Sequence, residues 1–493
     1  MRKSLFYFGV IFLILVSLYI FREPISRQPI LDKLVFKIQP ISYLSFDELV
    51  LLTQTKKPVG DLKEKLEKQL NTPYVVKSLW KAKELKKSYI RIAHWNIERG
   101  KNITDIKGIF LKPYKFYATN KANLKQKKHN KLLRELTALQ DSEIICLNEV
   151  DVGMPRTKYS NIAHELARQL GWNYVFAPEF IELGPILDKV KLDKGRYKGL
   201  HGNAIVSKYQ ILSTRLIRLP ECYRWFDAEM EKRSPLEYAR KAGAKAVFAQ
   251  DILTEVRRGG RNALIAEVEL PNKEILTVVS THLEDRCYPD CRLKQVKFLI
   301  NEIKNVNGPF ILAGDLNTST TDSAPTSVRK EIEKRLRDPH YLARQVAFAA
   351  VPGVSVAGGY GAIVVSKLLQ YKDPTIINIP VIFPNQERAL FNFLRGFQFS
   401  DGTKFDFGGD KERSLNKKTG LLSNSNERDF KGFKSTFKFE EPRLIAYFKL
   451  DWFFVKPKGN RFKPFNGQTL QLINNAYKGK VSDHDPMIVD INL

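Results

Sequence analysis

Residues 309–319 read PFILAGDLNTS, and this stretch decides the fold. Four apolar residues in succession, 310–313, are typical of a buried strand. Gly314 then lets the chain turn, and Asp315 and Asn317 follow. Side chains two positions apart in an extended segment project to the same side, so a carboxylate and an amide lie together here. Such a pair suits a hard cation, or a water beside a phosphoryl oxygen. The alternative is an Asp/Asn turn that only closes a hairpin.

The same design recurs along the chain, because several predicted strands end in polar or ionisable residues. Strands are expected at 89–96, 143–151, 262–270, 274–280, 449–455 and 487–491, and helices at 127–139, 161–170 and 291–303. Burial of polar groups beside such strands is costly unless they neutralise one another or bind a metal. The sequence therefore predicts one shared site formed by the strand-end residues Asn96, Glu149, Asn203, His282, Asp315, Asn317, Asp451, Asp483 and His484.

Composition narrows the class of protein without choosing a substrate. A hydrophobic content of 43% over 493 residues excludes a disordered chain and allows a large core. Lys and Arg number 81 against 53 Asp and Glu, a formal net charge of +28. Such a field favours polyanions, anionic membrane surfaces or phosphorylated small molecules.

The N-terminus predicts a membrane anchor. Residues 4–21 are 18 positions without charge, and at about 1.5 Å per residue a helix of that length spans most of a bilayer core. No small-x-small cleavage site follows, so residues 1–25 are interpreted as an uncleaved signal anchor rather than a removed signal peptide. The body is then expected outside the cytoplasm, and is secreted if the N-terminus is cleaved. Residues 26–88 have helical apolar spacing at 45–52 and 61–70 and form a helical preamble or linker, either a tether or a packed arm.

A large insertion interrupts the predicted domain of residues 89–493. It spans about 320–443, which is too long for a loop of a compact domain. Within it, residues 346–365 carry no charge. Three interpretations remain open for this run: a buried subdomain core or loop, a flap that dips into a membrane, and a second membrane span.

The four cysteines leave a disulfide open. Cys146 lies in an apolar run and is expected to be buried. Cys287 and Cys291 are close enough for a small disulfide loop, and Cys222 is an alternative partner. No second cysteine pair or nearby histidine pair completes four ligands, which argues against a zinc site.

Six short motifs follow one another along the chain: HWNI at 94–97, LNEV at 147–150, STHL at 280–283, GDLN at 314–317, LDW at 450–452 and SDHDP at 482–486. In this order they resemble the endonuclease/exonuclease/phosphatase superfamily, with its deoxyribonuclease I-like fold. The resemblance covers about residues 89–317 and 444–493. It implies a four-layer α/β sandwich of two packed mixed sheets flanked by helices, and Mg²⁺-dependent phosphoester hydrolysis, with Mn²⁺ as an alternative ion.

Matched motif by motif, the resemblance implies three residues around the metal. Glu149 is the principal ligand, Asn96 assists it, and Asp483 completes the metal or hydrogen-bond shell. Asn203 matches an amide that contacts the phosphate. Arg156, seven residues after Glu149, is a further candidate for substrate binding.

The remaining motif residues match catalytic roles in the family. Asp315 positions or deprotonates the attacking water, and Asn317 holds a phosphate oxygen. His484 lies beside the scissile phosphate and is oriented by Asp451, and His282 stabilises charge or protonates the leaving oxygen. The choice of base between Asp315 and His484 stays open. A cation and protonated imidazoles offset the charge that builds on phosphate oxygens during in-line attack.

These features together predict a membrane-anchored, monomeric phosphodiesterase with no obligate protein partner. Nucleic acid is the first choice of substrate because of the charge, although no interleaved aromatic and basic pattern typical of a stacking platform is visible. The alternatives are a sphingomyelinase-like lipid phosphodiesterase, a phosphomonoesterase and a catalytically silent membrane-surface binding protein. Glu284 and Arg286, close after His282, are further candidate substrate contacts.

Overall fold

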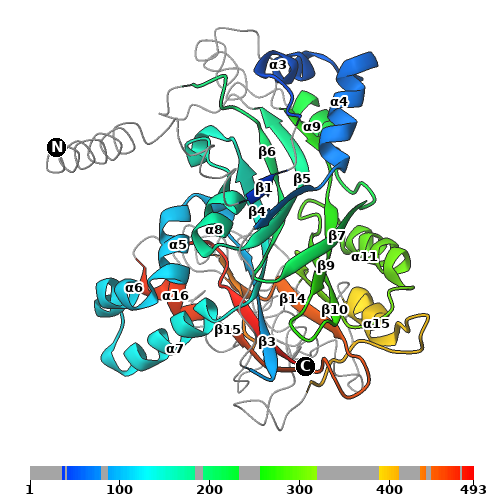
Figure 1. Cartoon of the computed structure of the whole chain (residues 1–493). Coiled ribbons are helices and arrows are strands. Elements are labelled where there is room, and N and C mark those ends of the chain that lie inside the picture. Colours follow the sequence, from blue (N-terminus) through cyan, green and yellow to red (C-terminus); the bar gives the residue numbers. More distant parts are fainter. Residues whose placement is uncertain are drawn as a thin grey trace, which may run out of the picture.

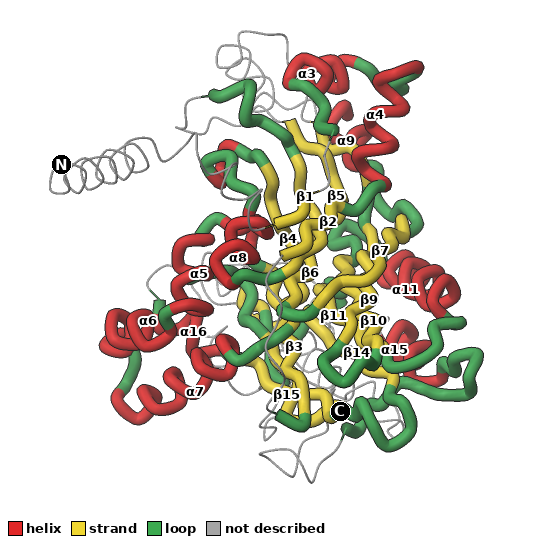
Figure 2. The backbone as a smooth tube through the Cα atoms, in the orientation of Figure 1, coloured by secondary structure: helices red, strands yellow, loops and turns green. Residues whose placement is uncertain are grey.

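Two mixed β-sheets pack face to face, and helices cover their outer faces (Figure 1). The computed structural model describes residues 36–38, 42–78, 87–183, 192–231, 256–318, 388–409, 433–439, 446–477 and 480–493. Figure 2 shows the two layers of strands in yellow, with helices in red at either side. The predicted α/β sandwich of two packed mixed sheets is therefore confirmed.

The larger sheet has nine strands among the described residues, and its parallel pair β3/β4 lies near the middle. β8 (Val256–Gly259) pairs with β5 beside the main path. In spatial order the other strands are β1 (Phe36–Ile38), β2 (Tyr74–Ser78), β5 (Asn173–Leu183), β6 (Leu200–Ser207), β4 (Ile144–Val152), β3 (Tyr89–Asn96), β16 (Met487–Asn492) and β15 (Pro464–Thr469).

The smaller sheet has five strands, with β10 and β11 parallel. Its spatial order is β14 (Asp451–Lys456), β11 (Phe310–Asp315), β10 (Ile275–His282), β9 (Asn262–Glu269) and β7 (Gln210–Arg218). The stretch that decides the fold is thus a fully buried inner strand, β11, as its apolar run predicts. A short separate ladder joins β12 (Phe437–Phe439) to β13 (Ala446–Phe448).

Alternating side chains of the central strands build two hydrophobic layers. Ile92 of β3 and Cys146 of β4 lie in one apolar cluster with Val278 and Leu312 of the smaller sheet, which α11 (Pro289–Ile303) and α15 (Arg388–Gly396) join. Trp95 and the other face of the larger sheet pack against the opposite helices. These helices are α5 (Ile103–Leu111), α6 (Pro113–Asn120), α7 (His129–Gln140), α8 (Ile162–Leu170) and α16 (Gln471–Ala476).

The segment before β3 is a packed arm of the larger sheet. Helices α3 (Phe46–Gln54) and α4 (Gly60–Asn71) match the helical spacing, and Ser45 caps α3 with a reciprocal bond to Glu48. The chain then forms β2, which pairs antiparallel with β5, so the segment predicted as a helical linker also supplies strands.

The predicted anchor at 1–25 and the uncharged run at 346–365 lie outside the described residues. No helix in the described part of the chain has the length and apolar character needed to cross a membrane.

One disulfide joins Cys222, just before helix α9 (Trp225–Glu231), to Cys291 in the first turn of α11. The two Cα atoms are 5.8 Å apart although 69 residues separate them in sequence. The small Cys287–Cys291 loop is therefore wrong, and the alternative partner Cys222 is the one used. Cys146 is buried, as expected.

Candidate functional site

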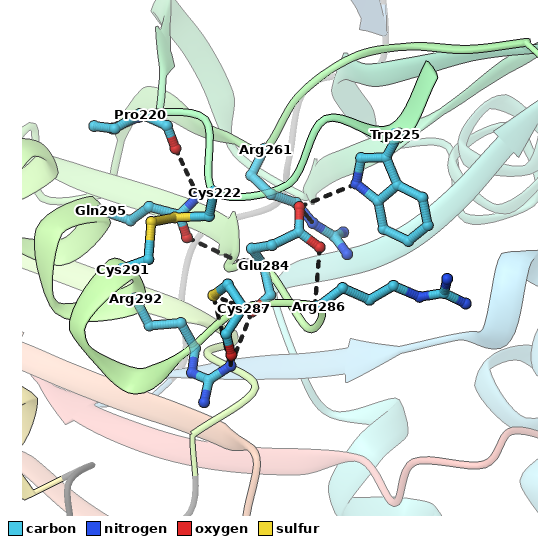
Figure 3. Close-up of a disulfide and its surroundings, with 10 residues drawn as sticks. All are labelled: Pro220, Cys222, Trp225, Arg261, Glu284, Arg286, Cys287, Cys291, Arg292 and Gln295. Carbon is cyan, nitrogen blue, oxygen red and sulfur yellow. Dashed lines mark hydrogen bonds and ion pairs between the residues drawn. A yellow bond between two sulfur atoms is a disulfide. The ribbon is translucent and has the colours of Figure 1, made fainter. Parts of the chain in front are cut away.

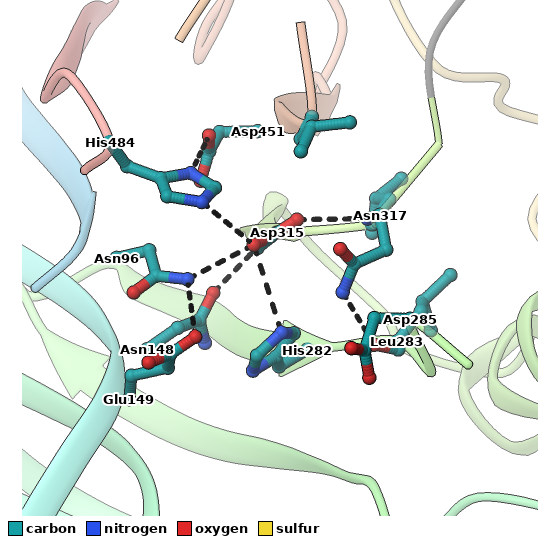
Figure 4. A network of polar contacts seen from close by, with 12 residues as sticks. Asn96, Asn148, Glu149, His282, Leu283, Asp285, Asp315, Asn317, Asp451 and His484 are labelled. Carbon is teal, nitrogen blue, oxygen red and sulfur yellow. Dashed lines mark hydrogen bonds and ion pairs between the residues drawn. The ribbon is translucent and has the colours of Figure 1, made fainter. Parts of the chain in front are cut away.

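Strands from both sheets deliver polar side chains to one edge of the sandwich (Figure 4). Asn96 is the last residue of β3, and His282 and Asp315 are the last residues of the parallel neighbours β10 and β11. Register pairs His282 with Asp315, and Asp315 with Asp451 of β14. Pairing within the smaller sheet therefore aligns residues that are up to 169 positions apart (282 to 451).

Asp315 is the centre of the network. Its Oδ2 accepts a hydrogen bond of 3.0 Å from Asn96 Nδ2 and lies 3.7 Å from His282 Nε2 and 3.6 Å from His484 Nε2. Its backbone N–H donates to Asn148 Oδ1 at 2.8 Å. The carboxylate is buried, so two imidazoles and one amide replace the water that would otherwise solvate it.

Glu149 reaches the same network through a β-bulge. The pairing of β4 with β6 shifts register between Leu147 and Val150, and Glu149 takes a left-handed φ of 54°. A bulge re-aims a side chain at the cost of local strain, which is typical of functional sites. Glu149 Oε1 accepts from Asn96 Nδ2 at 3.2 Å, and the side chain stays half-buried at the open side of the site.

His484 is held by a buried carboxylate that serves two histidines. Asp451 Oδ2 lies 2.7 Å from His484 Nδ1, and Asp451 Oδ1 lies 2.8 Å from Nε2 of His94. Burial lowers the pKa of His484, but the charges of Asp451 and Asp315 outweigh it and raise that pKa well above its usual value. The imidazole therefore carries a positive charge near neutral pH and points its Nε2–H at Asp315.

His282 is held between opposite charges. Its Nδ1 lies 3.5 Å from Glu179 Oε2 and 2.8 Å from Arg261 Nη1. Arg261 can donate to Nδ1 only when the ring is neutral, whereas Glu179 accepts from Nδ1 when the ring is protonated. Burial and the charge of Arg261 lower the pKa of His282, but Glu179 and Asp315 raise it by more. The pKa of His282 therefore lies above its usual value.

The acids at the open side fit a divalent cation. Burial, followed by the charges of Glu149, Glu98 and Asp315, raises the pKa of Asp483 to about 6, so carboxylates crowd one another there. A hard cation relieves such crowding and takes oxygen ligands. Glu149 and Asp483 are both only half-buried, whereas Asp315 is buried.

A second donor set is geometrically close. One donor atom each from Asp315, Asp451 and His484 lies within 4.8 Å of the others. A cation there would displace the bonds that Asp451 makes to His94 and His484, because both of its oxygens are already used.

The predicted amides Asn96 and Asn317 both lie in the site, and hydrogen bonds fix the orientation of each. Asn96 accepts the Glu98 N–H through its oxygen at 3.1 Å, so its NH₂ group faces Glu149 and Asp315 and holds these acids together. Asn317 takes a φ of 48°, so the chain turns after β11 instead of staying extended. Its N–H donates to Asp315 Oδ1 at 2.8 Å, and its Nδ2 donates to the carbonyl of Leu283 at 2.9 Å.

The two predicted substrate-binding residues already form hydrogen bonds or ion pairs with other residues of the chain. Asn203 is 0% exposed, and its Nδ2 donates to Glu179 Oε1 at 3.1 Å and Asn262 Oδ1 at 3.0 Å. Arg156 forms ion pairs with Asp151 at 2.6 Å and Glu182 at 2.8 Å. Asn203 and Arg156 are therefore placed to hold neighbouring polar side chains in position and not to contact a phosphate directly.

A family model described as the endonuclease/exonuclease/phosphatase family matches residues 93–484, most of the chain. The chain belongs to this family. Members of the endonuclease/exonuclease/phosphatase family are metal-dependent phosphoester hydrolases, and the chain is accordingly a hydrolase of this kind. None of the curated proteins matches the sequence.

Several solved structures of this family are similar to the chain. A 3′-5′ exonuclease from Neisseria meningitidis is 12% identical, with a TM-score of 0.39, over 82% of this chain and 100% of that one. An AP endonuclease from Archaeoglobus fulgidus is 12% identical, with a TM-score of 0.38, over 82% and 100%. The human Nocturnin catalytic domain is 14% identical, with a TM-score of 0.36, over 83% and 94%.

Sequence reasoning missed several residues of this endonuclease/exonuclease/phosphatase site. His94 lies inside the quoted HWNI motif, yet alternation along β3 gave no reason to link it to Asp451. Glu179 lies on β5, a strand that the sequence analysis did not predict, and its partner Arg261 was not among the predicted site residues. The insertion also reaches the site, because the ring of Phe437 lies 5.0 Å from that of His484.

Proposed function

We propose that this chain is a Mg²⁺-dependent phosphodiesterase that acts on nucleic acid. The carrying observation is the convergence of Glu149, Asp483 and Asp315 with two acid-paired histidines at one sheet edge. A cation held by Glu149 and Asp483 would supply Lewis-acid stabilisation of the phosphate charge. Mn²⁺ is the alternative ion with similar ligand preferences.

The protein's own groups divide the proton chemistry between them. His484, positively charged on its buried Asp451, donates from Nε2 to a non-bridging oxygen as charge builds there. With both imidazoles favouring protonation, the Asp315 carboxylate is the group that accepts the proton of the attacking water. His282 then gives its proton to the leaving oxygen as the P–O bond breaks, and Glu179 stabilises the ring before transfer.

Nucleic acid is proposed because of the net charge of +28, which attracts polyanions. A lipid head-group phosphodiester and a phosphomonoester are the other substrates compatible with the same chemistry. We further propose that residues 1–25 anchor a monomer to the membrane with its body outside the cytoplasm, because that stretch is uncharged and long enough to span.

The first test compares the protein with its E149A and H484A variants on a supercoiled plasmid, with Mg²⁺ and with EDTA. We expect nicking that needs the ion and falls about 10³-fold or more in both variants. Liposomes containing a choline- or inositol-head-group lipid run in parallel. Head-group release without nicking would reject the nucleic-acid proposal. Full activity of E149A in Mg²⁺ would reject the site.

A further inference from the structure

A cluster of arginine and aromatic side chains lies beside His282, although its members are scattered in sequence. Trp225 is its centre: the guanidinium carbon of Arg257 is 4.0 Å from the Trp225 ring centre, and that of Arg286 is 4.9 Å away. Tyr223 makes an edge contact with Trp225 at 4.8 Å, and Arg286 also lies 5.9 Å from the Tyr223 ring. We call Tyr223, Trp225 and Arg286 the rim cluster.

The rim cluster is fixed by one buried carboxylate. Glu284 is 2% exposed, and its Oε2 accepts the indole N–H of Trp225 at 3.1 Å while its Oε1 accepts the backbone N–H of Arg286 at 3.2 Å. Gln295 of α11 in turn donates to the carbonyl of Pro220 at 2.9 Å and accepts from the Glu284 N–H at 3.1 Å. Figure 3 shows these bonds around the disulfide, which ties the loop before Trp225 to α11.

Arg286 differs from its neighbours in having an exposed guanidinium and no acid partner among the described residues. Arg257 pairs with Glu182 at 2.9 Å, and Arg261 pairs with Glu179 at 3.0 Å. An arginine held on aromatic rings keeps its fork of donors oriented and loses little freedom on binding an anion. Arg286 is therefore oriented to bind an anionic group of a ligand.

The position of Arg286 sets which anion it meets. It follows His282 by four residues, so the two Cα atoms are at most about 14 Å apart. Arg261 links the two places, because it contacts His282 Nδ1 at 2.8 Å and Asp285 Oδ1 at 3.1 Å. Asp285 lies close to Asn317 at the edge of the network in Figure 4. An anion on Arg286 thus lies near the scissile phosphate, at the distance expected for a neighbouring part of the same substrate and not of a second molecule.

We propose that the rim cluster is a subsite for a second phosphate, and that the substrate is single-stranded nucleic acid. This inference rests on the proposed phosphodiesterase function and adds its substrate class. A polynucleotide supplies both a neighbouring phosphate for Arg286 and bases that stack on aromatic and guanidinium planes. A choline head group offers no second anion, and its positive charge is repelled by Arg286. An inositol polyphosphate shares the second-phosphate chemistry and serves as the competing source.

The test uses the full chain and its R286A, R286K and R134A variants. Arg134 is an exposed arginine of helix α7 in the opposite helical layer, so R134A makes the same change of net charge away from the rim cluster. Two readouts are taken: kcat/KM on a single-stranded oligonucleotide and on bis(p-nitrophenyl) phosphate, and oligonucleotide binding by fluorescence anisotropy against salt in Ca²⁺.

We expect R286A to lower kcat/KM about tenfold more on the oligonucleotide than on the small diester, with R286K intermediate because it lacks the planar fork. The slope of log Kd against log salt should fall by about 0.7, the value for one contact with a single strand. R134A should change neither quantity by more than about twofold.

The possible outcomes separate this inference from the proposed function. Absence of Mg²⁺-dependent turnover on both diesters rejects the phosphodiesterase, while the salt slope still tests the rim cluster. Equal losses on both diesters in R286A, or a salt slope equal to that of R134A, reject the subsite. A loss in R286A that is measured in the same way on a phosphoinositide or an inositol polyphosphate, with none on the oligonucleotide, keeps the second-phosphate site but rejects nucleic acid as its source.

Discussion

The two histidines that flank Asp315 have different hydrogen-bond and charge partners, and this difference indicates different roles in the reaction. His484 lies on Asp451, whose other oxygen contacts a second imidazole, His94, at 2.8 Å. His282 lies between Glu179 and the guanidinium of Arg261. Both Nε2 atoms approach the same oxygen of Asp315, at 3.6 and 3.7 Å, so the partners behind the rings are what distinguishes them.

The partners determine how firmly each ring holds its proton. The pKa of His484 is raised well above its usual value by Asp451 and Asp315 in spite of burial. The pKa of His282 is also raised, but Arg261 opposes the increase, because a neighbouring cation disfavours the imidazolium. A ring that keeps its proton is suited to charge stabilisation, and a ring nearer to neutrality is suited to proton transfer. We therefore expect the two histidines to respond differently to the leaving group.

The largest effect is expected from H484A. Loss of a fixed positive donor beside the scissile phosphate should lower kcat by about 10³-fold, because charge on the non-bridging oxygens develops with any leaving group. The loss should be equal for an oligonucleotide and for bis(p-nitrophenyl) phosphate, measured at saturating Mg²⁺. If the activated diester rescues H484A, then His484 and not His282 protonates the leaving oxygen, and the comparison is reversed.

A second, smaller effect separates His282 from His484. H282A should lose about 10²-fold on the oligonucleotide, whose leaving alkoxide needs a proton. On the p-nitrophenyl diester the loss should be below about tenfold, because p-nitrophenolate leaves without protonation. For each variant, the fold-loss on the oligonucleotide is divided by the fold-loss on the p-nitrophenyl diester. The measurement is this ratio for H282A divided by the ratio for H484A. A quotient of one contradicts the assignment of roles.

Much of the site follows from the sequence because it is carried by strand ends. Apolar runs marked β3, β4, β10, β11 and β14, and an acid, amide or histidine at each end marked the site edge. The β-bulge at Glu149 could not be predicted, because bulges depend on pairing with a partner strand. Nor could the turn at Asn317, which breaks the extended geometry expected for it.

The rim cluster could not be predicted from the sequence. No aromatic and basic pattern typical of a stacking platform was visible, yet Tyr223, Trp225 and Arg286 meet in the fold. These residues come from two segments about 60 positions apart, brought together by the Cys222–Cys291 disulfide. The same long-range contact explains why the short Cys287–Cys291 loop was the wrong expectation. Sequence patterns report periodicity within a segment, whereas such clusters depend on which segments the topology places side by side.

His94 offers a sharper test of the His484 side of the comparison. It is fully buried, and its Nε2 contacts Asp451 Oδ1, so it holds the carboxylate that orients His484. H94F should lower kcat by about tenfold and leave KM within twofold, as expected for a residue that acts through another. The matched variant H164F changes a histidine of α8 whose ring lies 5.7 Å from that of Tyr174 in the helical layer. Equal kcat losses in both would indicate a general effect of packing.

The smallest effect is expected outside the site, at a buried acid with no imidazole to hold it. Glu135 of α7 is 3% exposed, and burial raises its pKa to about 7, although Lys131 and the Leu472 N–H oppose that increase. Because the folded chain binds this proton more tightly than the unfolded chain, the free energy of unfolding falls as pH rises from about 4.5 to about 7. The loss is nearly complete by about pH 8 and amounts to about 3 kcal/mol.

E135Q keeps an acceptor for the Leu472 N–H and removes the titration. Denaturant unfolding at pH 5 and pH 8 should therefore show a smaller pH-dependent loss of stability in E135Q than in the parent, by about 1–2 kcal/mol. D451N is the matched contrast, because partner imidazoles depress the pKa of Asp451, so its stability contribution is present at neutral pH and fades only in acid. D451N should lose stability at pH 8, and E135Q should gain it. Opposite signs would show that a buried carboxylate in this fold is tolerated as an anion only where histidine or arginine faces it, which is the condition that the site edge satisfies.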